Sequence, residues 1–305
     1  MWLLLAFLSA ALLGFYDVFK KRSLRDNAVI PVLFVNTLLC SLFFLPLIAG
    51  SAFGGFSAGE VGFVPLCGWR EHSYVILKSL IVLSSWICGY FAIKHLPLTI
   101  VGPVNASRPV LTLVGALLIF GERLNLWQWA GVVLALFSFF LLSRSGKKEG
   151  INFVHNRWIL LLVVAAVLGA CSGLYDKYLM APAGYGGVGL DKMFVQGWYN
   201  VYQALMMAVV MLFLWLPVRK KTTPFSWKWS IVFISVFLTA ADLAYFYALS
   251  QPEAMISVVS MVRRSSVLVS FLFGALAFHE KNLKAKAFDL FLVLLGIICL
   301  YIGTA

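Results

Sequence analysis

The chain has 305 residues, of which 62% are hydrophobic and 12% are charged, and its mean hydropathy is +0.94. This apolar share lies well above that of an ordinary soluble domain, so the composition excludes a soluble fold. The net charge of +12 does not indicate nucleic-acid binding, because the basic residues are scattered between apolar runs rather than gathered on one face.

Ten apolar runs follow one another, each near the roughly 20 residues that a helix needs to cross a bilayer. The first, 2–19, has no basic segment before it and is followed at once by Lys20, Lys21 and Arg22, which predicts an uncleaved helix rather than a signal peptide. No run alternates as a membrane β-barrel strand does, so the sequence predicts an all-α integral membrane protein with ten transmembrane helices. The other nine runs are 30–49, 73–93, 98–120, 125–143, 157–179, 192–216, 229–249, 254–278 and 285–303.

Lysine and arginine are concentrated in the connections after the odd-numbered runs, such as Arg144, Lys147 and Lys148 after the fifth. The even-numbered connections carry few, with Arg70 and Lys78 assigned to the one after the second run. The positive-inside rule then predicts cytoplasmic odd-numbered connections and two extracytoplasmic termini. We expect a multi-pass protein of a cell membrane, with a bacterial inner membrane as its location.

Two short motifs occur twice at nearly the same separation. From Asp17 to Glu122 the chain advances 105 residues, and from Asp176 to Glu280 it advances 104. This spacing predicts two related halves, 1–150 and 151–305, each with five helices. Because five is an odd number, the halves must cross the membrane in opposite directions as inverted repeats. The motifs are Gly14-Phe15-Tyr16-Asp17 with Gly173-Leu174-Tyr175-Asp176, and Phe120-Gly121-Glu122 with Phe278-His279-Glu280.

Three arginines stand well inside apolar runs, Arg108 in the fourth and Arg263 and Arg264 in the ninth. A charge at the centre of a membrane helix costs roughly 2.5 to 3.5 kcal/mol, so each needs a partner or a wet cavity. Asn105 precedes Arg108 by one turn, and together they could hold a carboxylate or phosphate of a substrate. The alternative is a structural ion pair, with Asp242 in the eighth run as the natural partner of one ninth-run arginine.

Further polar residues could control access or contact a ligand. Tyr16-Asp17 and Tyr175-Asp176, near the ends of the first and sixth runs, are candidates for coupling or gating, as is Asp242. Trp86, Asn200 and Tyr245 are candidates for substrate contact, although aromatic residues near a span end are also typical of an interfacial belt. In the structural alternative for the gating residues, each repeat aspartate caps a helix or pairs with Lys20, Lys21 or Lys177.

The sequence contains no pattern that points to catalysis, a metal or another cofactor. The four histidines lie far apart in the sequence, and the five cysteines form no CxxC pair. No GxSxG motif is present, and Gly184–Gly189 fits GxGxxG only by letters, because it follows a membrane helix rather than a strand. We therefore expect neither an enzyme nor a metalloprotein.

Several features together resemble the EamA-type transporters of the drug/metabolite transporter superfamily. They are the two five-helix halves, the turns Phe120-Gly121-Glu122-Arg123-Leu124 and His279-Glu280, and the entry Leu96-Pro97-Leu98 to the fourth run. The resemblance implies a basket of helices around a central cavity lined by helices 1, 3, 4, 6, 8 and 9, and transport of amino acids, sugars, nucleobases or organic ions. The pair Arg263-Arg264 is also reminiscent of the phosphate-binding pair of the triose-phosphate translocator branch.

The expected function is that of a secondary transporter, or permease, for a small polar metabolite, which could be anionic, working by alternating access. Its partners would be this small molecule and the lipid bilayer, with a proton or counter-substrate as the coupling species, and it would act as a monomer or homodimer. The alternatives are a flippase for lipids or lipid-linked precursors and an exporter of amino acids or drug-like amphiphiles. A membrane-embedded enzyme would need converging acid, base or nucleophilic groups, which the sequence does not show.

Overall fold

The computed structural model describes residues 2–57, 59–60, 62–106, 108, 111, 125–127, 129–131, 133–134, 137, 141, 156–180, 187–249, 262–263, 265–277 and 283–304. Within these residues the chain is helical between short connections and contains no strand, which confirms the predicted all-α class. The elements are α1 (Trp2–Leu24), α2 (Val29–Ala52), α3 (Trp69–His95), α4 (Leu98–Ala106), α7 (Arg157–Met180), α8 (Lys192–Val210), the π-helical turn η2 (Met211–Trp215), the 3-10 helix η3 (Leu216–Lys221), α9 (Ser230–Leu249), α11 (Ser266–Ala277) and α12 (Leu283–Thr304).

Six helices in the described part of the chain are long and apolar enough to cross a membrane: Leu3–Leu24, Val29–Ala52, Trp69–His95, Arg157–Met180, Lys192–Lys221 and Ser230–Ala248. A shorter apolar helix covers Ser266–Leu276. The predicted runs 98–120, 125–143 and 254–278 lie partly or mostly outside the described residues. The number of ten helices therefore stays a prediction.

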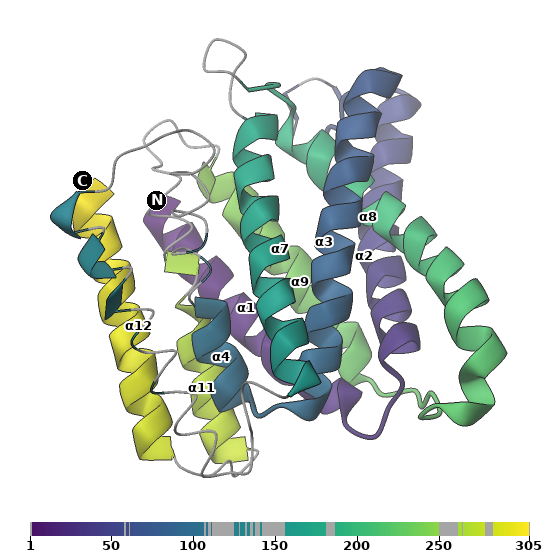
Figure 1. Ribbon diagram of the computed structural model, residues 1–305. Helices are drawn as coiled ribbons and strands as arrows, with labels where there is room; N and C mark the ends of the chain where they lie inside the picture. Colours follow the sequence, from purple (N-terminus) through teal and green to yellow (C-terminus); the bar gives the residue numbers. More distant parts are fainter. Residues whose placement is uncertain are drawn as a thin grey trace.

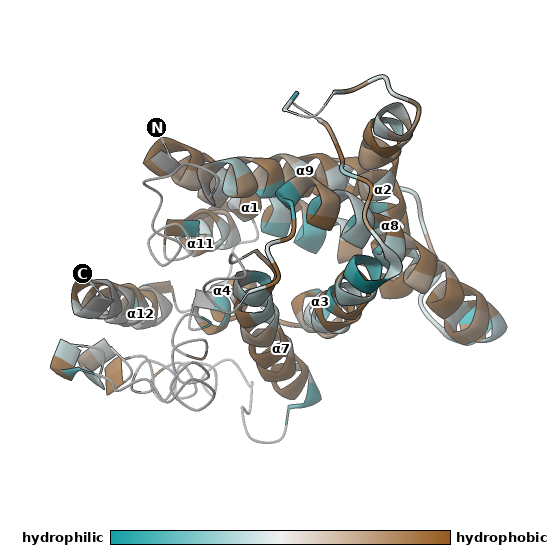
Figure 2. Ribbon diagram, turned by 90° about the horizontal axis from the view of Figure 1, so that it is seen from above, coloured by the Kyte–Doolittle hydropathy of each residue, from teal (hydrophilic) through white to brown (hydrophobic). Residues whose placement is uncertain are grey.

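The helices stand side by side in a bundle whose layout is visible from two directions (Figures 1 and 2). α1 packs along α9, α3 along α7, and α2 along α8, while α11 lies against both α1 and α4. The first residues of α1 and the last residues of α12 lie at the same end of the bundle (Figure 1). Helices that are far apart in the sequence therefore form the main contacts of the fold.

Serine hydroxyls join the two most extensive of these helix pairs. On α1, Ser9 Oγ donates to the Ala241 carbonyl at 2.7 Å, and Ser23 Oγ donates to Ser230 Oγ at 2.7 Å, both across to α9. On α3, Ser85 Oγ donates to the carbonyl of Ala165 on α7 at 2.7 Å. Small hydroxyl-bearing residues let membrane helices approach closely and bond across the contact, so α1–α9 and α3–α7 are held in the same way.

The outer surfaces of the helices are apolar. Leu4 on α1 is 74% exposed, and Leu160 on α7 and Leu212 in η2 are more than half exposed. Viewed from above, most of the outward ribbon is hydrophobic (Figure 2). Side chains of this kind gain nothing from water and suit contact with lipid tails, which is the arrangement expected of a membrane-embedded bundle.

Several lysines that the sequence reading counted with the connections lie inside helices. α1 continues to Leu24 and so includes Lys20 and Lys21, which corrects the predicted end at residue 19. Lys78, counted with the second connection although it falls within the predicted run 73–93, lies inside α3, which begins at Trp69. Lys21 Nζ donates to the carbonyls of Ile93 at 2.7 Å and Leu96 at 2.6 Å, so it satisfies acceptors at the end of α3. The boundaries were missed because a long basic side chain can extend an apolar helix when a neighbouring helix supplies its partner.

Gly14 allows α1 to approach α11 closely, and we expect Gly14→Ala to destabilise the protein. An added Cβ would lie 2.3 Å from Val269 Cβ and 2.9 Å from the Ser266 carbonyl oxygen, neither of which is a flexible chain end. Overpacking of this kind costs about 1–3 kcal/mol, measurable as a lower apparent melting temperature of the detergent-purified protein. The matched control is Gly173→Ala at the equivalent position of the repeat motif, where nothing lies within 4 Å. Equal effects of the two substitutions would contradict the packing argument.

Candidate functional site

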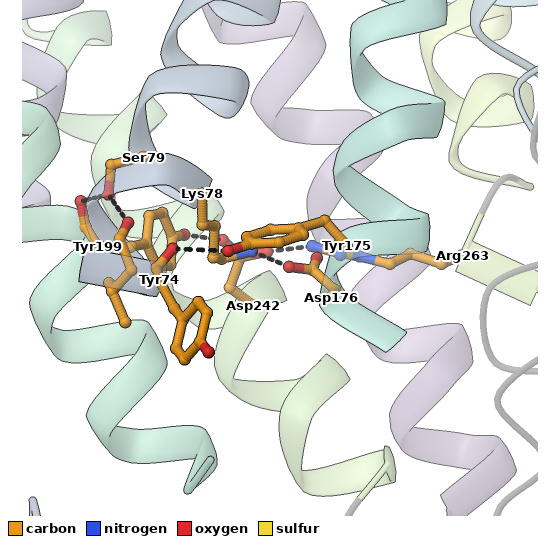
Figure 3. A network of polar contacts seen from close by, with 9 residues as sticks. Tyr74, Lys78, Ser79, Tyr175, Asp176, Tyr199, Asp242 and Arg263 are labelled. Atoms are coloured by element: carbon orange, nitrogen blue, oxygen red, sulfur yellow. Dashed lines mark hydrogen bonds and ion pairs between the residues drawn. The ribbon is translucent and has the colours of Figure 1, made fainter. Parts of the chain in front are cut away.

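A buried ion pair connects α3 and α7. Lys78 Nζ donates to Asp176 Oδ1, with side-chain exposures of 4% for the lysine and 20% for the aspartate (Figure 3). The ammonium also lies 5.2 Å from the centre of the Tyr199 ring of α8, within the range of a cation–π contact. Asp176 was predicted as a coupling or gating residue, with Lys177 named in the structural alternative. The structure pairs Asp176 with Lys78, and the Lys177 side chain lies outside what is described.

A second ion pair is also in contact with Tyr199. Arg263 Nη2 donates to Asp242 Oδ1 on α9, and the hydroxyl of Tyr199 donates to Asp242 Oδ2 at 2.8 Å (Figure 3). The Arg263 guanidinium stacks 4.2 Å from the ring centre of Tyr245. The predicted pairing of Asp242 with a ninth-run arginine is therefore confirmed, and the carboxylate is satisfied on both oxygens.

A third polar cluster surrounds the end of the first repeat motif. Asp17 pairs with Lys20 at 2.7 Å, one of the partners named in the structural alternative for this aspartate. Lys20 Nζ lies 4.2 Å from the ring centre of Tyr16 and 5.2 Å from that of Tyr90 on α3. The two tyrosine hydroxyls are 3.5 Å apart. Asp17 thus lies about two turns inside α1 rather than at its end.

Arg108 joins this third cluster from the fourth predicted run. Its positive guanidinium attracts the Asp17 carboxylate and repels the Lys20 ammonium. The same guanidinium lies against Gly169 of α7, where an added Cβ would be 2.8 Å from Arg108 Cζ and Nη1. The absence of a side chain at Gly169 therefore provides the space that the arginine occupies.

The remaining predicted site residues have more local surroundings. Asn105 Oδ1 on α4 is buried without a hydrogen bond, whereas Trp86 packs against the main hydrophobic core. Asn200 Nδ2 donates to the Gln196 carbonyl one turn earlier at 2.9 Å. Tyr175 donates its hydroxyl to the Tyr74 carbonyl at 3.3 Å. Arg264 lies outside the described residues, as do Glu122 and Glu280.

Two residues that the sequence reading did not select, Lys78 and Tyr90, are central to these clusters. Lys78 carried a signal, because a lysine inside an apolar run has to be paired or exposed to water. Tyr90 carried none, because a tyrosine in a membrane helix has many structural roles. Only the helix packing places them beside the charged groups. No three His, Cys, Asp or Glu side chains in the described ranges are placed to hold a metal ion.

Residues 1–144 match the EamA-like transporter family. This match confirms the resemblance to the drug/metabolite transporter superfamily that the sequence motifs indicated. The EamA-like family is membrane-embedded and consists of transporters, in agreement with the candidate spans found here.

A solved structure shares the fold of this chain. A crystal structure described only as that of a protein aligns with a TM-score of 0.63 at 16% identity, covering 99% of this chain and 97% of the other. At this identity the likeness shows the fold alone. It spans both halves of the chain, whereas the family match is confined to the first. A comparison with curated proteins found no match.

Proposed function

We propose that this EamA-like protein is a secondary transporter for a small polar metabolite, with ten helices in two inverted halves, 1–150 and 151–305, that rock between two states. The observation that carries the proposal is the Lys78–Asp176 pair, a buried charge contact between the two halves. Charged groups in a membrane core are costly and are typical of substrate or ion pathways. A rocking motion of the two halves would also change the contacts between them, and this ion pair is one of those contacts.

The helix pairing supports the proposed inverted repeat. If the first helix of one half corresponds to the first helix of the other, α1 corresponds to α7 and α3 corresponds to α9. The α1–α9 contact then has the α3–α7 contact as its counterpart, and both are extensive and serine-bonded. The family match ends at residue 144, close to the proposed boundary at 150.

The third cluster supports an anionic group on the substrate. Arg108 and Lys20 both lie close to Asp17, at the point where α1, the fourth run and α7 meet. A guanidinium binds carboxylate or phosphate through two parallel hydrogen bonds, and in a membrane core this attraction is weakly screened. Among the described arginines, Arg108 is our candidate for this contact, because its guanidinium lies against the side-chain-free position of Gly169 beside Asp17.

The proposal is tested by thermal unfolding of the detergent-purified protein with organic acids, sugar phosphates, amino acids and nucleosides, because a ligand of the folded state raises its apparent stability. We expect an anionic class to raise the melting temperature and Arg108→Gln to abolish that increase. Compounds of that class should then be taken up by proteoliposomes containing the wild type. Stabilisation by cationic compounds alone would contradict the anionic assignment, and absence of uptake would contradict transport.

Gly169→Ala provides a second test that leaves Arg108 in place. The new methyl group would displace the guanidinium without removing its charge, because an arginine side chain can move where backbone cannot. We expect the ligand-induced shift to fall at least several-fold while the melting temperature of the free protein changes little. Gly173→Ala, one turn further along α7 in open surroundings, should retain the full shift. A retained shift in Gly169→Ala would argue against Arg108 as a ligand group.

Coupling to a proton or a counter-substrate belongs to the same proposal, with Asp17, Asp176 and Asp242 as the candidate carboxylates and Tyr16 and Tyr175 as their neighbours. A carboxylate that changes surroundings between two states can take up and release a proton. Uptake into proteoliposomes with and without an imposed pH gradient measures the proton, and preloading with unlabelled substrate measures exchange. Uptake that responds to neither would exclude both forms of coupling.

The proposed orientation, with both termini outside, places the connection between α2 and α3 on the extracytoplasmic side. Cys67 lies in this connection, while the other four cysteines lie within helices. Partial burial and the nearby Glu71 and Asp191 carboxylates raise the pKa of the Cys67 thiol, so labelling should accelerate above about pH 8.5, as thiolate forms. A membrane-impermeant maleimide should label right-side-out vesicles of the wild type and spare Cys67→Ser. If Cys67 is labelled only after the vesicles are opened, the connection between α2 and α3 is cytoplasmic and the orientation is the opposite of the proposed one.

A further inference from the structure

Two glutamines of α8 are fully buried and have no hydrogen-bond partner for either side-chain atom. Gln196 and Gln203 are both 0% exposed, and the Nε2 and Oε1 atoms of each lack a partner. On α2, Asn36 is also 0% exposed, and its Nδ2 is likewise unpartnered. Five buried polar atoms on two adjacent helices therefore have no hydrogen-bond partner among the residues that the structure describes.

The glutamines share one face of α8 with Asn200, and we call these three residues the amide stripe. Positions 196, 200 and 203 are spaced by four and three residues, which aligns them along a helix. Gly197, on one side of the stripe, faces Ile48 of α2. On the other side of the stripe, the backbone carbonyl of Tyr199 accepts from Ser79 Oγ of α3, and the Tyr199 hydroxyl donates to Asp242 of α9. The amide stripe thus lies between the α2 and α3 contacts, on the side where Tyr199 reaches α9.

Polar groups of α9 and α2 continue toward the charged clusters. Ser235 Oγ donates to Asn36 Oδ1 at 3.1 Å, which leaves the amide nitrogen of Asn36 as its unused group. Cys40 Sγ lies 3.9 Å from Asn36 Oδ1 and interacts electrostatically with Asp242, Tyr16 and Tyr90. Of the amides with unpartnered atoms, Asn36 therefore lies beside Cys40, which interacts with both the Asp242 pair and the cluster around Asp17.

A buried amide without a partner lowers the stability of a folded protein, because it gives up hydrogen bonds to water and receives none in return. Two such glutamines on one face of one helix are hard to explain by packing, since leucine has a similar volume and no polar atoms. Each primary amide both donates and accepts. The groups that satisfy it best also do both, and these are hydroxyls and other amides.

We infer that the amide stripe, together with Asn36, binds an uncharged, hydroxyl- or amide-bearing part of the transported substrate. This inference rests on the proposed transport function and specifies a further part of the substrate, because Arg108 accounts only for an anionic group. A substrate with an acidic group and several hydroxyls or an amide would use both sets of residues. The stability lost at the free amides is recovered when the substrate is bound.

The test uses Gln196→Leu and Gln203→Leu, with D-ribose, inosine and L-glutamine as probes in thermal unfolding. Without ligand, each substitution should raise the apparent melting temperature by about 2 °C or more, because it removes unsatisfied polar atoms at nearly constant volume. Each should also abolish the shift that a probe produces in the wild type. The matched control is Asn27→Leu, since Asn27 is a fully buried amide whose oxygen and nitrogen are bonded to Ser226, and here the melting temperature should fall.

The outcomes separate this inference from the proposed function. Lower melting temperatures for both glutamine variants would mean that structural water satisfies the amides, and would overturn the inference. A retained probe shift in both variants, or no shift of the wild type with any of the three probes, would also overturn it. Loss of anion-induced stabilisation in Arg108→Gln, with full stabilisation in the glutamine variants, would overturn the inference while the proposed transport site stands.

Discussion

Asp242→Asn should lower the apparent melting temperature of the purified protein by about 5 °C or more, corresponding to roughly 3 kcal/mol. The Asp242 carboxylate accepts from both Arg263 and Tyr199, and the side chains of the ion pair are only 12% and 18% exposed. An asparagine amide would offer one acceptor and no charge. The Arg263 guanidinium would then remain in the membrane core without compensation, which is the main cost of breaking a buried pair.

Two further variants identify the origin of this loss. Tyr199→Phe removes one hydrogen bond to Asp242 and leaves the ion pair intact, so it should cost only about 1–2 kcal/mol. Asp242→Asn combined with Arg263→Gln removes both charges and should recover most of the stability lost in the single variant. A double variant as unstable as the sum of its parts would show that the pair is not coupled, and would contradict the assigned contact.

The second large effect is expected at the contact between α3 and α7, where Asp176→Leu should be more damaging than Lys78→Met. Asp176→Leu leaves the Lys78 ammonium, which is only 4% exposed, without its partner. Lys78→Met leaves the Asp176 carboxylate without its partner, and this group is 20% exposed and therefore less deeply buried. Removing one partner of a buried pair costs about 3–5 kcal/mol, and the deeper charge should approach the upper end. Both values are measured by thermal unfolding in the same detergent.

The exposed pair Arg25–Asp26 serves as the control for this measurement. Its side chains are 80% and 92% exposed, so Arg25→Met should change the stability by less than about 0.5 kcal/mol. Lys78→Met combined with Asp176→Leu should be more stable than either single variant. If the two single substitutions had effects as small as Arg25→Met, Lys78 and Asp176 would not form a buried pair in the native protein.

These pairs limit which parts of the bundle can move. Lys78–Asp176 and Ser85–Ala165 tie α3 to α7, and the serine bonds of α1 tie it to α9. A rocking motion of the proposed halves would have to break or carry these contacts. Gln196 and Gln203 of the amide stripe have no such partners among the described residues, so their side chains can bond to a ligand without breaking a protein contact.

The sequence by itself determined the class of the protein. Apolar runs of about 20 residues leave no alternative to membrane helices, because backbone groups in lipid must be bonded within the helix. The family resemblance was also carried by local motifs, and the match over residues 1–144 confirms it. The pairing of Asp242 with a ninth-run arginine could be predicted, because a charge in the membrane core requires a partner and few carboxylates were within reach.

The tertiary structure alone decided which charges meet across helices. Lys78 was assigned to a connection, and its pairing with Asp176 depends on α3 lying against α7, which sequence spacing does not encode. The position of Arg108 against Gly169 and the unpartnered state of Gln196 and Gln203 have the same origin. Hydropathy reports the environment of a whole helix, averaged over its length. The rotation of each helix and the choice of its neighbour depend on contacts between residues that are distant in the sequence, and these select the partners of every buried polar group.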